Sequence, residues 1–450
     1  MRKTIHFSGI GGVGMSALAQ IAAMEGRSVS GSDRDFDRGR NTRVRAALEA
    51  LGVKIYPQDG SGVNAATAEL ALSTAIEDSN PEVLRAKELG VKISHRSELL
   101  AGQVDRFDSI VVAGTSGKST AAAMLFAVLD AAGLGPSIIT GGALVQLQER
   151  GLIGNAFRGK GNILVVEADE SDGSIVRYKP KTGVLLNISK DHKELPELNK
   201  IFLEFAGHCG RVLVNADDAA ARALLPAAPA FGFDAGGWKV ENVRLEPFLS
   251  RFLLNGLEFV VPAPGLYNIE NALAACAAAA LYGAAPEAAR AGLANFRGVE
   301  RRFRLVGEKN GVKVVDDFAH NPAKVSAVLK ALRLAGGGRV FAVYQPHGFA
   351  PTRHLRAELI QAFVAGLAGE DTLVMPEIYY AGGTAAKDIS SKDITGAVAA
   401  AGRRALFFAD RGQIPGALAG QARPGDIIAV MGARDATLSD FARQVLEALP

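Results

Sequence analysis

Cysteine is nearly absent from this sequence, which has two, Cys209 and Cys276, in 450 residues. They lie far apart and form no Cys-x-x-Cys pair, so neither a disulfide framework nor a zinc site is expected. No apolar run is long enough to span a membrane. The first residues, Met1–Phe7, lead into a glycine-rich turn and not into the long apolar segment of a secretory leader. We therefore expect a cytoplasmic, soluble enzyme with no membrane partner.

An excess of one charge is also missing. The formal net charge is +3, so no basic surface for nucleic acid is indicated. Hydrophobic residues make up 48% of the chain, which is ample for buried cores. A chain of this length is expected to divide into two to four domains.

The chain opens with a strand, a glycine turn and a helix. Lys3–Phe7 has the pattern of a strand, Gly9–Gly14 reads Gly-x-Gly-x-x-Gly, and Met15–Met24 has helical apolar spacing. Asp33 ends the next strand, about twenty residues on, where a ribose-binding acid is expected. The pattern suits a dinucleotide, any other nucleotide with a diphosphate, or a turn that serves packing alone. Residues 1–104 are predicted to form one parallel α/β domain.

The strongest motif is a phosphate-binding turn at Val111–Thr120. An apolar strand leads into Gly114-Thr115-Ser116-Gly117-Lys118-Ser119-Thr120, which opens an Ala-rich helix. Backbone N–H groups of such a turn bind phosphate, the lysine adds charge, and a hydroxyl serves Mg²⁺. Val112 stands where the general P-loop has its first glycine, so this is a shorter Gly-x-x-Gly-Lys-Ser variant. A glycine turn with a solvated lysine is the alternative.

Carboxylates and a histidine follow two later strands of the same region. The strand Asn162–Val166 runs into Glu167-Ala168-Asp169-Glu170-Ser171-Asp172, and Val184–Ile188 is followed by Asp191-His192. A carboxylate at a strand end of a P-loop domain is where Mg²⁺ is held, so Glu167 is the preferred ligand. The bland alternatives are a solvated acidic loop and a structural histidine. This domain is predicted to span 105–298. Near its end a helix is predicted from Ala272, with Asn268 as its candidate cap. Contact of the polar groups there with a base or ribose is the alternative.

The last third, 299–450, alternates strands and helices and is predicted to be a second doubly wound sheet. Functional loops of such sheets lie at the carboxyl ends of the strands. Three ends carry polar residues, namely Asp316–Asn321, Gln345–Gly348 and Gly432–Asp435.

Together these motifs resemble the Mur ligase family of ATP-dependent amide-forming enzymes along the whole chain. The likeness includes Ser73-Thr74-Ala75-Ile76 and Asn268–Ala275. It implies three α/β domains: an N-terminal Rossmann-like UDP-binding domain, a central P-loop ATPase-type domain and a C-terminal doubly wound Rossmann-like domain. The implied reaction joins the carboxylate of UDP-N-acetylmuramate to the amine of an amino acid through an acyl phosphate, with ATP and Mg²⁺ as cofactors. L-Alanine is the preferred candidate for the amino acid. A monomer or weak homodimer is expected.

The resemblance also implies site residues. The UDP-sugar is expected to contact Gly9, Gly11, Gly12, Gly14, Met15, Ser16, Asp33, Ser73, Thr74 and Ala75. ATP is expected to contact Gly114, Thr115, Ser116, Gly117, Lys118, Ser119, Thr120, Asn271, Arg302 and Asp317. The Mg²⁺ ligands would be Ser119, Glu167 and His192. The catalytic residues would be Lys118, Glu167, His192, His320 and His347, with the last two near the incoming amine.

Several positions depart from the family pattern and leave the amine open. Phe318-Ala319 replaces the Tyr-Gly of alanine-adding members and matches members that attach a recycled tripeptide. The family arginines that follow Gln345-Pro346-His347 are replaced by Gly348–Pro351. A short-peptide amine is therefore the alternative within the class. Two alternatives belong to other functional classes. One is an NAD(P)-dependent oxidoreductase that uses Gly9–Asp33, and the other is a catalytically silent binding subunit.

Overall fold

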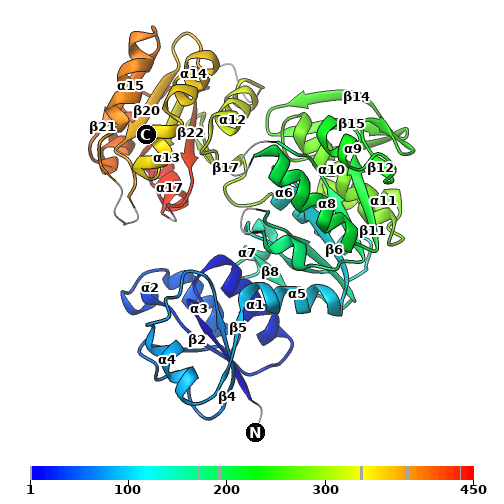
Figure 1. Cartoon of the computed structure of the whole chain (residues 1–450). Helices are drawn as coiled ribbons and strands as arrows, with labels where there is room; N and C mark the ends of the chain where they lie inside the picture. Colours follow the sequence, from blue (N-terminus) through cyan, green and yellow to red (C-terminus); the bar gives the residue numbers. More distant parts are fainter. Residues whose placement is uncertain (1–2, 171–172, 190–193, 335–337, 381–385, 436) are drawn as a thin grey trace. The chain divides into compact units, whose positions relative to one another are not determined.

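The computed structural model describes residues 3–170, 173–189, 194–334, 338–380, 386–435 and 437–450. The chain forms two compact units, of which the second consists of Arg244–Ser250, Ala263–Gly265 and Glu300–Pro450 and the first of the rest. The first unit holds two mostly parallel sheets and the second unit one, all with helices packed on them (Figure 1). The predicted α/β class is confirmed. The boundaries 1–104, 105–298 and 299–450 stay a prediction.

The N-terminal sheet is parallel, with the strand order β3-β2-β1-β4-β5. Its strands are β1 (Thr4–Ser8), β2 (Val29–Ser32), β3 (Lys54–Tyr56), β4 (Thr67–Leu72) and β5 (Lys92–His95). Its helices are α1 (Val13–Met24), α2 (Arg34–Asp37), α3 (Thr42–Ala50), α4 (Pro81–Glu88) and α5 (Arg96–Arg106). The central strand β1 leads into the glycine turn and α1, so the turn lies at the carboxyl edge, where ligands bind in such sheets.

The middle sheet has the order β12-β11-β10-β6-β9-β7-β8, and only the β7–β8 pair is antiparallel. Its strands are β6 (Asp108–Ala113), β7 (Ser137–Ile139), β8 (Ala156–Phe157), β9 (Ile163–Glu167), β10 (Thr182–Leu185), β11 (Arg211–Asn215) and β12 (Ala230–Phe231). Its helical elements are α6 (Lys118–Ala131), α7 (Val145–Gln148), η1 (Ser174–Arg177), α8 (Leu195–His208), α9 (Ala219–Leu224), α10 (Leu266–Ala280) and α11 (Pro286–Ala294). Because β6 is covered on both faces, its run Ile110–Ala113 is fully apolar and buried.

A smaller four-stranded sheet follows in the chain, with the order β13-β14-β15-β16. The strands are β13 (Asp234–Ala235), β14 (Trp238–Glu246), β15 (Leu249–Leu254) and β16 (Leu257–Val261). Alternate side chains of β15 are buried, Ser250, Phe252 and Leu254, which is the period of two expected for a half-buried strand.

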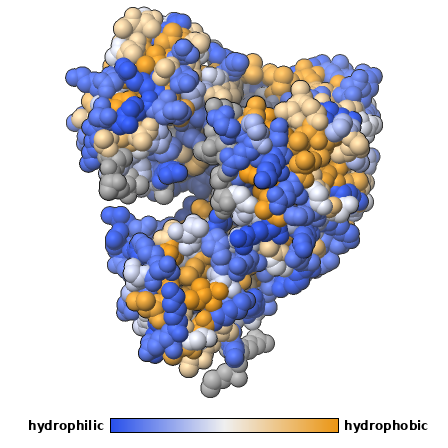
Figure 2. Space-filling model, viewed as in Figure 1, coloured by the Kyte–Doolittle hydropathy of each residue, from blue (hydrophilic) through white to orange (hydrophobic). Residues whose placement is uncertain are grey.

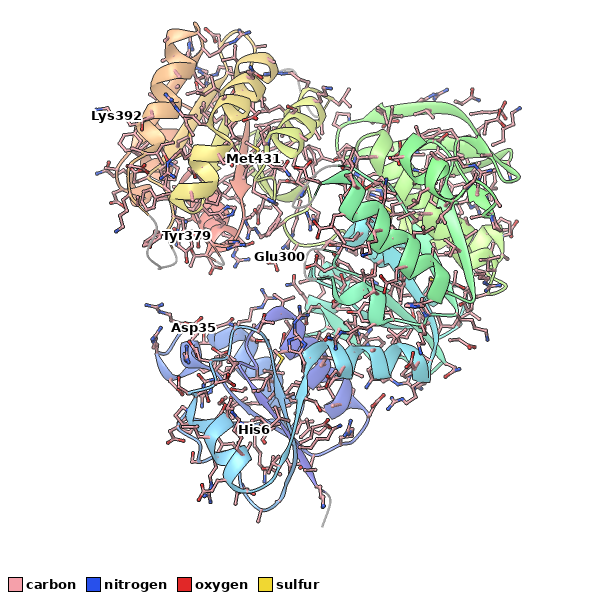
Figure 3. The ribbon with its side chains drawn as sticks, in the orientation of Figure 1. His6, Asp35, Glu300, Tyr379, Lys392 and Met431 are labelled. Carbon is pink, nitrogen blue, oxygen red and sulfur yellow. The ribbon has the colours of Figure 1, made fainter. Side chains whose placement is uncertain are left out.

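The C-terminal sheet has the order β17-β18-β22-β19-β20-β21, with β17 antiparallel at one edge. Its strands are β17 (Arg304–Lys309), β18 (Val312–Asp317), β19 (Val340–Gln345), β20 (Thr372–Pro376), β21 (Arg404–Phe408) and β22 (Ile427–Gly432). Its helical elements are α12 (Pro322–Leu334), α13 (Phe349–His354), α14 (Arg356–Gly366), α15 (Ser391–Ala400), η2 (Arg411–Gln413), α16 (Ile414–Ala419) and α17 (Leu438–Ala448). Figure 3 labels Met431 on the central strand β22.

The cores follow the sheets. Two separate clusters cover the C-terminal sheet, one with Val315 and Ala342 and the other with Val314 and Phe341, so neighbouring residues of a strand face opposite layers. In the first unit one continuous cluster joins apolar residues of the N-terminal sheet, such as Ile5, to those of the middle sheet. These two sheets therefore share a core.

No helix among the described residues is long and apolar enough to cross a membrane. Large exposed hydrophobic side chains come from many different elements, for example Val13, Leu84 and Leu203. On the face drawn in Figure 2, hydrophobic groups lie among hydrophilic ones.

Candidate active site

The N-terminal glycine turn is held in place by Asp33. The Gly11 N–H donates to Asp33 Oδ2 at 2.9 Å, and Asp33 Oδ1 accepts from the Asp35 N–H at 2.9 Å. A Cβ at Gly11 would lie 2.9 Å from that carboxylate, so the close approach requires glycine. Burial raises the pKa of Asp33, and the two backbone donors oppose this effect. Asp33, which directly follows β2, thus holds the glycine turn in place. Its contact with a ribose stays a prediction.

A pocket of about 500 Å³ opens beside this turn. Nine of the ten residues predicted to contact the UDP-sugar line it, namely Gly9, Gly11, Gly12, Gly14, Met15, Asp33, Ser73, Thr74 and Ala75. The tenth, Ser16, is buried and does not line it. Its hydroxyl donates to the Val13 carbonyl, and it accepts from the Asn155 amide at 3.0 Å.

The pocket also has polar lining that the sequence reading missed. The added residues include Arg34, Asn41, Gln58 and Arg96. The Arg96 guanidinium is close to the turn, since a Cβ at Gly14 would lie 3.2 Å from its Nη1. Arg96 is the first residue of α5 and directly follows β5. An arginine at the carboxyl end of a predicted strand could therefore have indicated this pocket from the sequence.

The second glycine turn, Gly114–Lys118, connects β6 to α6. Gly117 has φ +83°, and a Cβ there would lie 2.4 Å from Asn271 Oδ1. Only glycine therefore allows both this backbone conformation and the close approach of α10. The structure brings Asn271 to the turn, as the resemblance implied for an ATP contact.

Asn187, which the sequence reading missed, braces this turn. Its Oδ1 accepts from the Ser116 N–H at 2.8 Å and from the Thr115 hydroxyl at 3.0 Å. Its Nδ2 donates to the Ser116 carbonyl at 3.0 Å. The sequence predicted that Asn187 lies within a strand, Val184–Ile188, whereas β10 (Thr182–Leu185) ends two residues before it. A lone amide at the end of an apolar strand was the available signal.

Lys118 is held by two acceptors. Its Nζ donates to the Gly114 carbonyl at 2.7 Å and to Glu170 Oε2 at 2.6 Å. The side chains of Lys118 and Glu170 are 14% and 5% exposed, so the ion pair is shielded from solvent. The lysine is therefore aimed across the turn that is predicted to hold the phosphates, and a solvated lysine is not what the structure has.

Glu167 ends β9 and accepts three hydrogen bonds. The Ser119 hydroxyl donates to Oε1 at 2.7 Å, while the Thr140 hydroxyl and the Gly141 N–H donate to Oε2 at 2.6 and 2.7 Å. The structure thus brings together two of the three predicted Mg²⁺ ligands, Ser119 and Glu167. Two hard oxygen donors suit Mg²⁺, which keeps several waters and also binds substrate phosphates.

The third predicted ligand, His192, lies outside the described residues, as do Asp191, Ser171 and Asp172. Among the residues that are described, no group of three or more His, Cys, Asp or Glu side chains is arranged to hold a metal. Of the three predicted Mg²⁺ ligands, the structure therefore describes only Ser119 and Glu167.

The predicted cap at Asn268 is wrong. Helix α10 begins at Leu266, so Asn268 lies inside its first turn. Its Oδ1 accepts from the Asn271 amide at 3.4 Å, and both side chains are buried. The helix starts earlier because Pro264-Gly265 ends the preceding segment.

In the second unit, Asp317 ends β18 and accepts two backbone hydrogen bonds, from the N–H groups of Phe303 and Ala319 at 2.7 Å each. Burial raises the pKa of the Asp317 carboxyl to about 6, although Arg302 and the two N–H donors act in the opposite direction. The Arg302 guanidinium lies over the Phe318 ring at 5.1 Å. Both predicted ATP contacts of this unit thus lie at one strand end.

The two histidines predicted near the amine also meet. The rings of His320 and His347 are 5.8 Å apart, edge to face, and His320 makes a similar contact with Phe318 at 5.5 Å. His320 follows β18 and His347 follows β19, which flank β22 in the sheet. Figure 3 labels Tyr379, whose backbone pairs with His347.

A buried charged cluster beside them was not predicted. The Arg301 guanidinium donates to the carbonyls of Gly432 and Asp435 at 2.5 and 3.3 Å, and its Nε lies 3.6 Å from Asp316 Oδ1. Burial lowers the pKa of Arg301 and raises that of Asp316, while the charge of each opposes the shift of the other. The cluster ties the segment before β17 to the end of β22.

Comparison with known proteins places these features in one family. Three family models match the chain: "Mur ligase family, catalytic domain" over residues 4–108, "Mur ligase middle domain" over 112–279, and "Mur ligase, glutamate ligase domain" over 301–434.

Relatives cover nearly the whole chain. A UDP-N-acetylmuramate–L-alanine ligase of Streptomyces avermitilis is 37% identical over 96% of this chain and 95% of its own length. One from Kineococcus radiotolerans is 38% identical over 96% and 94%. The crystal structure of the UDP-N-acetylmuramate–alanine ligase of Thermotoga maritima matches with a TM-score of 0.82 and 25% identity, covering 99% and 98% of the two chains. The chain belongs to the Mur ligase family.

Proposed function

We propose that this protein is an ATP-dependent ligase that joins the carboxylate of UDP-N-acetylmuramate to the amine of L-alanine in peptidoglycan precursor synthesis. The observation that carries the proposal is the grouping of Lys118, Ser119 and Glu167 at one glycine turn. It occurs in a chain that is 37% identical, nearly end to end, to a ligase of that name. Family membership disfavours a nicotinamide-dependent oxidoreductase, and the intact Lys118 and Glu167 disfavour a catalytically silent subunit.

The chemistry proceeds in two displacements. A carboxylate oxygen of the sugar nucleotide attacks the γ-phosphorus of ATP, forming an acyl phosphate and releasing ADP. The amine nitrogen then attacks the acyl carbon, phosphate leaves, and the nitrogen loses a proton. Because a carboxylate must approach a triphosphate, the first step depends on neutralising charge.

Lys118 supplies one positive charge at the turn. Ser119 and Glu167 would hold Mg²⁺, which when bound neutralises phosphate oxygens. Glu170 is a counter-ion that keeps Lys118 aimed across the turn until phosphate oxygens replace it. Asn187 keeps the turn in the shape that exposes N–H groups of the α6 N-terminus to anions.

The N-terminal pocket is the proposed site for the UDP-sugar. Its glycine turn precedes α1, whose N-terminus favours a diphosphate, and Arg96 adds a cation. The size of about 500 Å³ is in the range of small-molecule sites. Arg302 and Asp317 remain predicted ATP contacts from the second unit.

The amine is the least constrained part of the proposal. His320 and His347, whose rings are 5.8 Å apart, follow the strands on either side of β22 and would accept the proton that the amine loses. However, Phe318-Ala319 matches peptide-adding members of the family, and Gly348–Pro351 lacks the arginines of alanine-adding ones. A short peptide as the amine is therefore the second candidate.

An amine screen tests the proposal. Phosphate release is measured with UDP-N-acetylmuramate, ATP and Mg²⁺ while the amine varies among L-alanine, glycine, L-serine and a tripeptide of the murein type. Release that requires all components and is fastest with L-alanine is expected. Release with the tripeptide alone would establish the second candidate, and release independent of any amine would contradict both.

We also propose that the protein works in the cytoplasm as a monomer or weak homodimer. Light scattering at micromolar concentration should give a mass near 47 kDa or a concentration-dependent average between one and two chains.

A further inference from the structure

Thr140 and Asn155 directly extend the antiparallel strand pair β7–β8, which is called the hairpin here although α7 lies in its loop, and they connect the two glycine-turn sites of the first unit. Strands β7 and β8 pair antiparallel, with Ile139 opposite Ala156. The next pair along the hairpin is Thr140 and Asn155, joined by a hydrogen bond from the Thr140 N–H to the Asn155 carbonyl at 2.9 Å. Both residues are buried, at 3% and 2% exposure.

The Asn155 side chain reaches the helix that follows the N-terminal glycine turn. Its Nδ2 donates to the Val13 carbonyl at 2.7 Å and to Ser16 Oγ at 3.0 Å, and its Oδ1 accepts from the Gln20 amide at 2.8 Å. Helix α1 packs against β8 (Figure 1). Val13 and its neighbours Gly14 and Met15 line the N-terminal pocket. Asn155 therefore holds the first turn of α1, the part that a diphosphate in this pocket would contact.

The Thr140 side chain reaches the other site. Its hydroxyl donates to Glu167 Oε2 at 2.6 Å and accepts from the Gly142 N–H at 3.2 Å. Because the other Glu167 oxygen accepts from Ser119, Thr140 helps to fix the orientation of this carboxylate. Outer hydrogen bonds of this kind orient metal ligands and tune metal affinity.

We propose that Asn155 and Thr140 are positioning residues that couple binding in the N-terminal pocket to the geometry of Glu167, and so to binding of a magnesium nucleotide at the Gly114–Lys118 turn. This inference rests on the proposed function for the identity of the two ligands. A ligand that orders the first turn of α1 also orders Asn155, and the shared backbone hydrogen bond passes that order to Thr140. When one ligand is bound, the second ligand loses less conformational entropy on binding. The sugar nucleotide and the magnesium nucleotide therefore strengthen each other's binding by the same factor.

The chain offers a matched control in the same hairpin. Ser137 on β7 is fully buried, and its hydroxyl accepts from Arg158 Nη1 at 3.1 Å and the Gly159 N–H at 3.0 Å. The Ser137 hydroxyl itself contacts neither α1 nor Glu167, and Arg158 meets α1 only at its last residue, Met24, far from the first turn that Asn155 holds. Ser137→Ala therefore removes buried hydrogen bonds from the hairpin without touching the proposed connection.

The test is a coupling measurement by calorimetry. The Kd of a non-hydrolysable ATP analogue with Mg²⁺ is determined with and without saturating UDP-N-acetylmuramate. We expect the sugar nucleotide to tighten nucleotide binding in the wild type by a factor of roughly 5 to 150. Thr140→Val should bring that factor close to one and weaken the Mg²⁺-dependent binding by about tenfold. Thr140→Ser, which keeps the hydroxyl, should restore both, and Ser137→Ala should leave the factor unchanged.

Asn155→Ala should also remove the coupling while each ligand still binds alone. If this variant does not fold, Thr140→Val decides the question, because it leaves the contacts of Asn155 with α1 intact. Independent binding of the two ligands to the wild type overturns the inference and leaves the proposed function standing. Equal loss of coupling in Ser137→Ala and Thr140→Val reduces the hairpin to a structural role and also overturns it. A wild type that binds neither ligand defeats both the proposed function and the inference.

Discussion

The two glycine turns of the first unit have the same local architecture and different chemistry. Each follows a central parallel strand, β1 or β6, and each opens a helix, α1 or α6. The N-terminal turn is ordered by the carboxylate of Asp33, and the cation beside Gly14, Arg96, comes from a different helix. The middle turn carries its own Lys118 and has a hydroxyl and a carboxylate beside it. The first turn suits a phosphate that is only bound, and the second suits one that is transferred.

The strands that lead into the turns differ as well. In β6 the residues before the turn are apolar, whereas β1 contains His6 and Ser8, both fully buried. His6 Nε2 lies 2.9 Å from Glu82 Oε1 on α4, and the Ser8 hydroxyl donates to Glu82 Oε2 at 2.5 Å. Figure 3 labels His6 inside the N-terminal sheet. A polar network thus anchors the N-terminal turn, and apolar packing anchors the other.

The largest effect should come from the group that only the middle turn has. Glu167→Gln removes the negative charge beside Ser119 and should reduce turnover by roughly 10³-fold, measured by phosphate release. UDP-N-acetylmuramate binding and the melting temperature should hardly change. Glu204→Gln, on the exposed side of α8, is the control. Turnover of Glu167→Gln at the wild-type rate would remove the distinction between the turns.

The polar anchor of the N-terminal turn gives the second prediction. Glu82→Gln replaces one acceptor oxygen of the buried hydrogen bonds with Ser8 and His6 by an amide donor and should lower the free energy of unfolding by about 2 kcal/mol, measured by urea denaturation. Glu88→Gln on the same helix removes only an exposed pair with Arg85 and should cost less than about 0.5 kcal/mol. Similar losses in the two variants would show that the buried network has no special role.

A third variant tests whether the two turns bind separate ligands. Arg96→Met removes the cation beside Gly14 and should weaken UDP-N-acetylmuramate binding by about tenfold, equivalent to about 1.4 kcal/mol. The affinity for magnesium nucleotide in the absence of the sugar should stay the same, because Arg96 belongs to the N-terminal pocket. Calorimetry with each ligand alone measures both effects. An equal loss for the two ligands would contradict the assignment.

The smallest predicted effect extends the comparison to the C-terminal sheet. Asp317 ends β18 as Glu167 ends β9, but burial raises its pKa to about 6. The folded state therefore binds the proton more tightly than the unfolded chain does, and Asp317 lowers stability as the pH rises from about 4 to about 6. Because the side chain is partly exposed, solvent screening should limit this loss to roughly 1 kcal/mol.

Asp317→Asn should abolish that component of the pH dependence. The difference in unfolding free energy between the variant and the wild type should shift by about 1 kcal/mol between pH 4 and pH 7. A difference that does not vary with pH would mean that Asp317 titrates normally.

Sequence patterns predicted those parts of the site that local chain geometry creates. A glycine turn between an apolar strand and a helix is a local feature, so Gly9–Gly14 and Gly114–Lys118 could be located without a structure. Glu167 was accessible for the same reason, since it directly follows a buried strand. The family resemblance supplied the expected ligands of both turns, which the turns alone left open.

The supporting contacts could not be predicted because they join residues that are distant in the chain. Thr140 reaches Glu167, and Asn187 reaches the middle turn, each from the end of another strand. Arg301 donates to the carbonyl of Gly432, which is 131 positions away in the chain. Such pairings depend on strand order, which periodicity does not specify. The misplaced cap at Asn268 has a local origin, because the Ala-rich pattern marked the middle of α10 more clearly than its start.

The most direct test of the central claim compares wild type with Lys118→Met in two calorimetric titrations, one with a non-hydrolysable ATP analogue and Mg²⁺ and one with UDP-N-acetylmuramate. The account predicts that the wild type binds both ligands and that the variant keeps the sugar nucleotide but loses most of its nucleotide affinity. Nucleotide binding by the variant at wild-type affinity, or no nucleotide binding by the folded wild type in the presence of Mg²⁺, would contradict it.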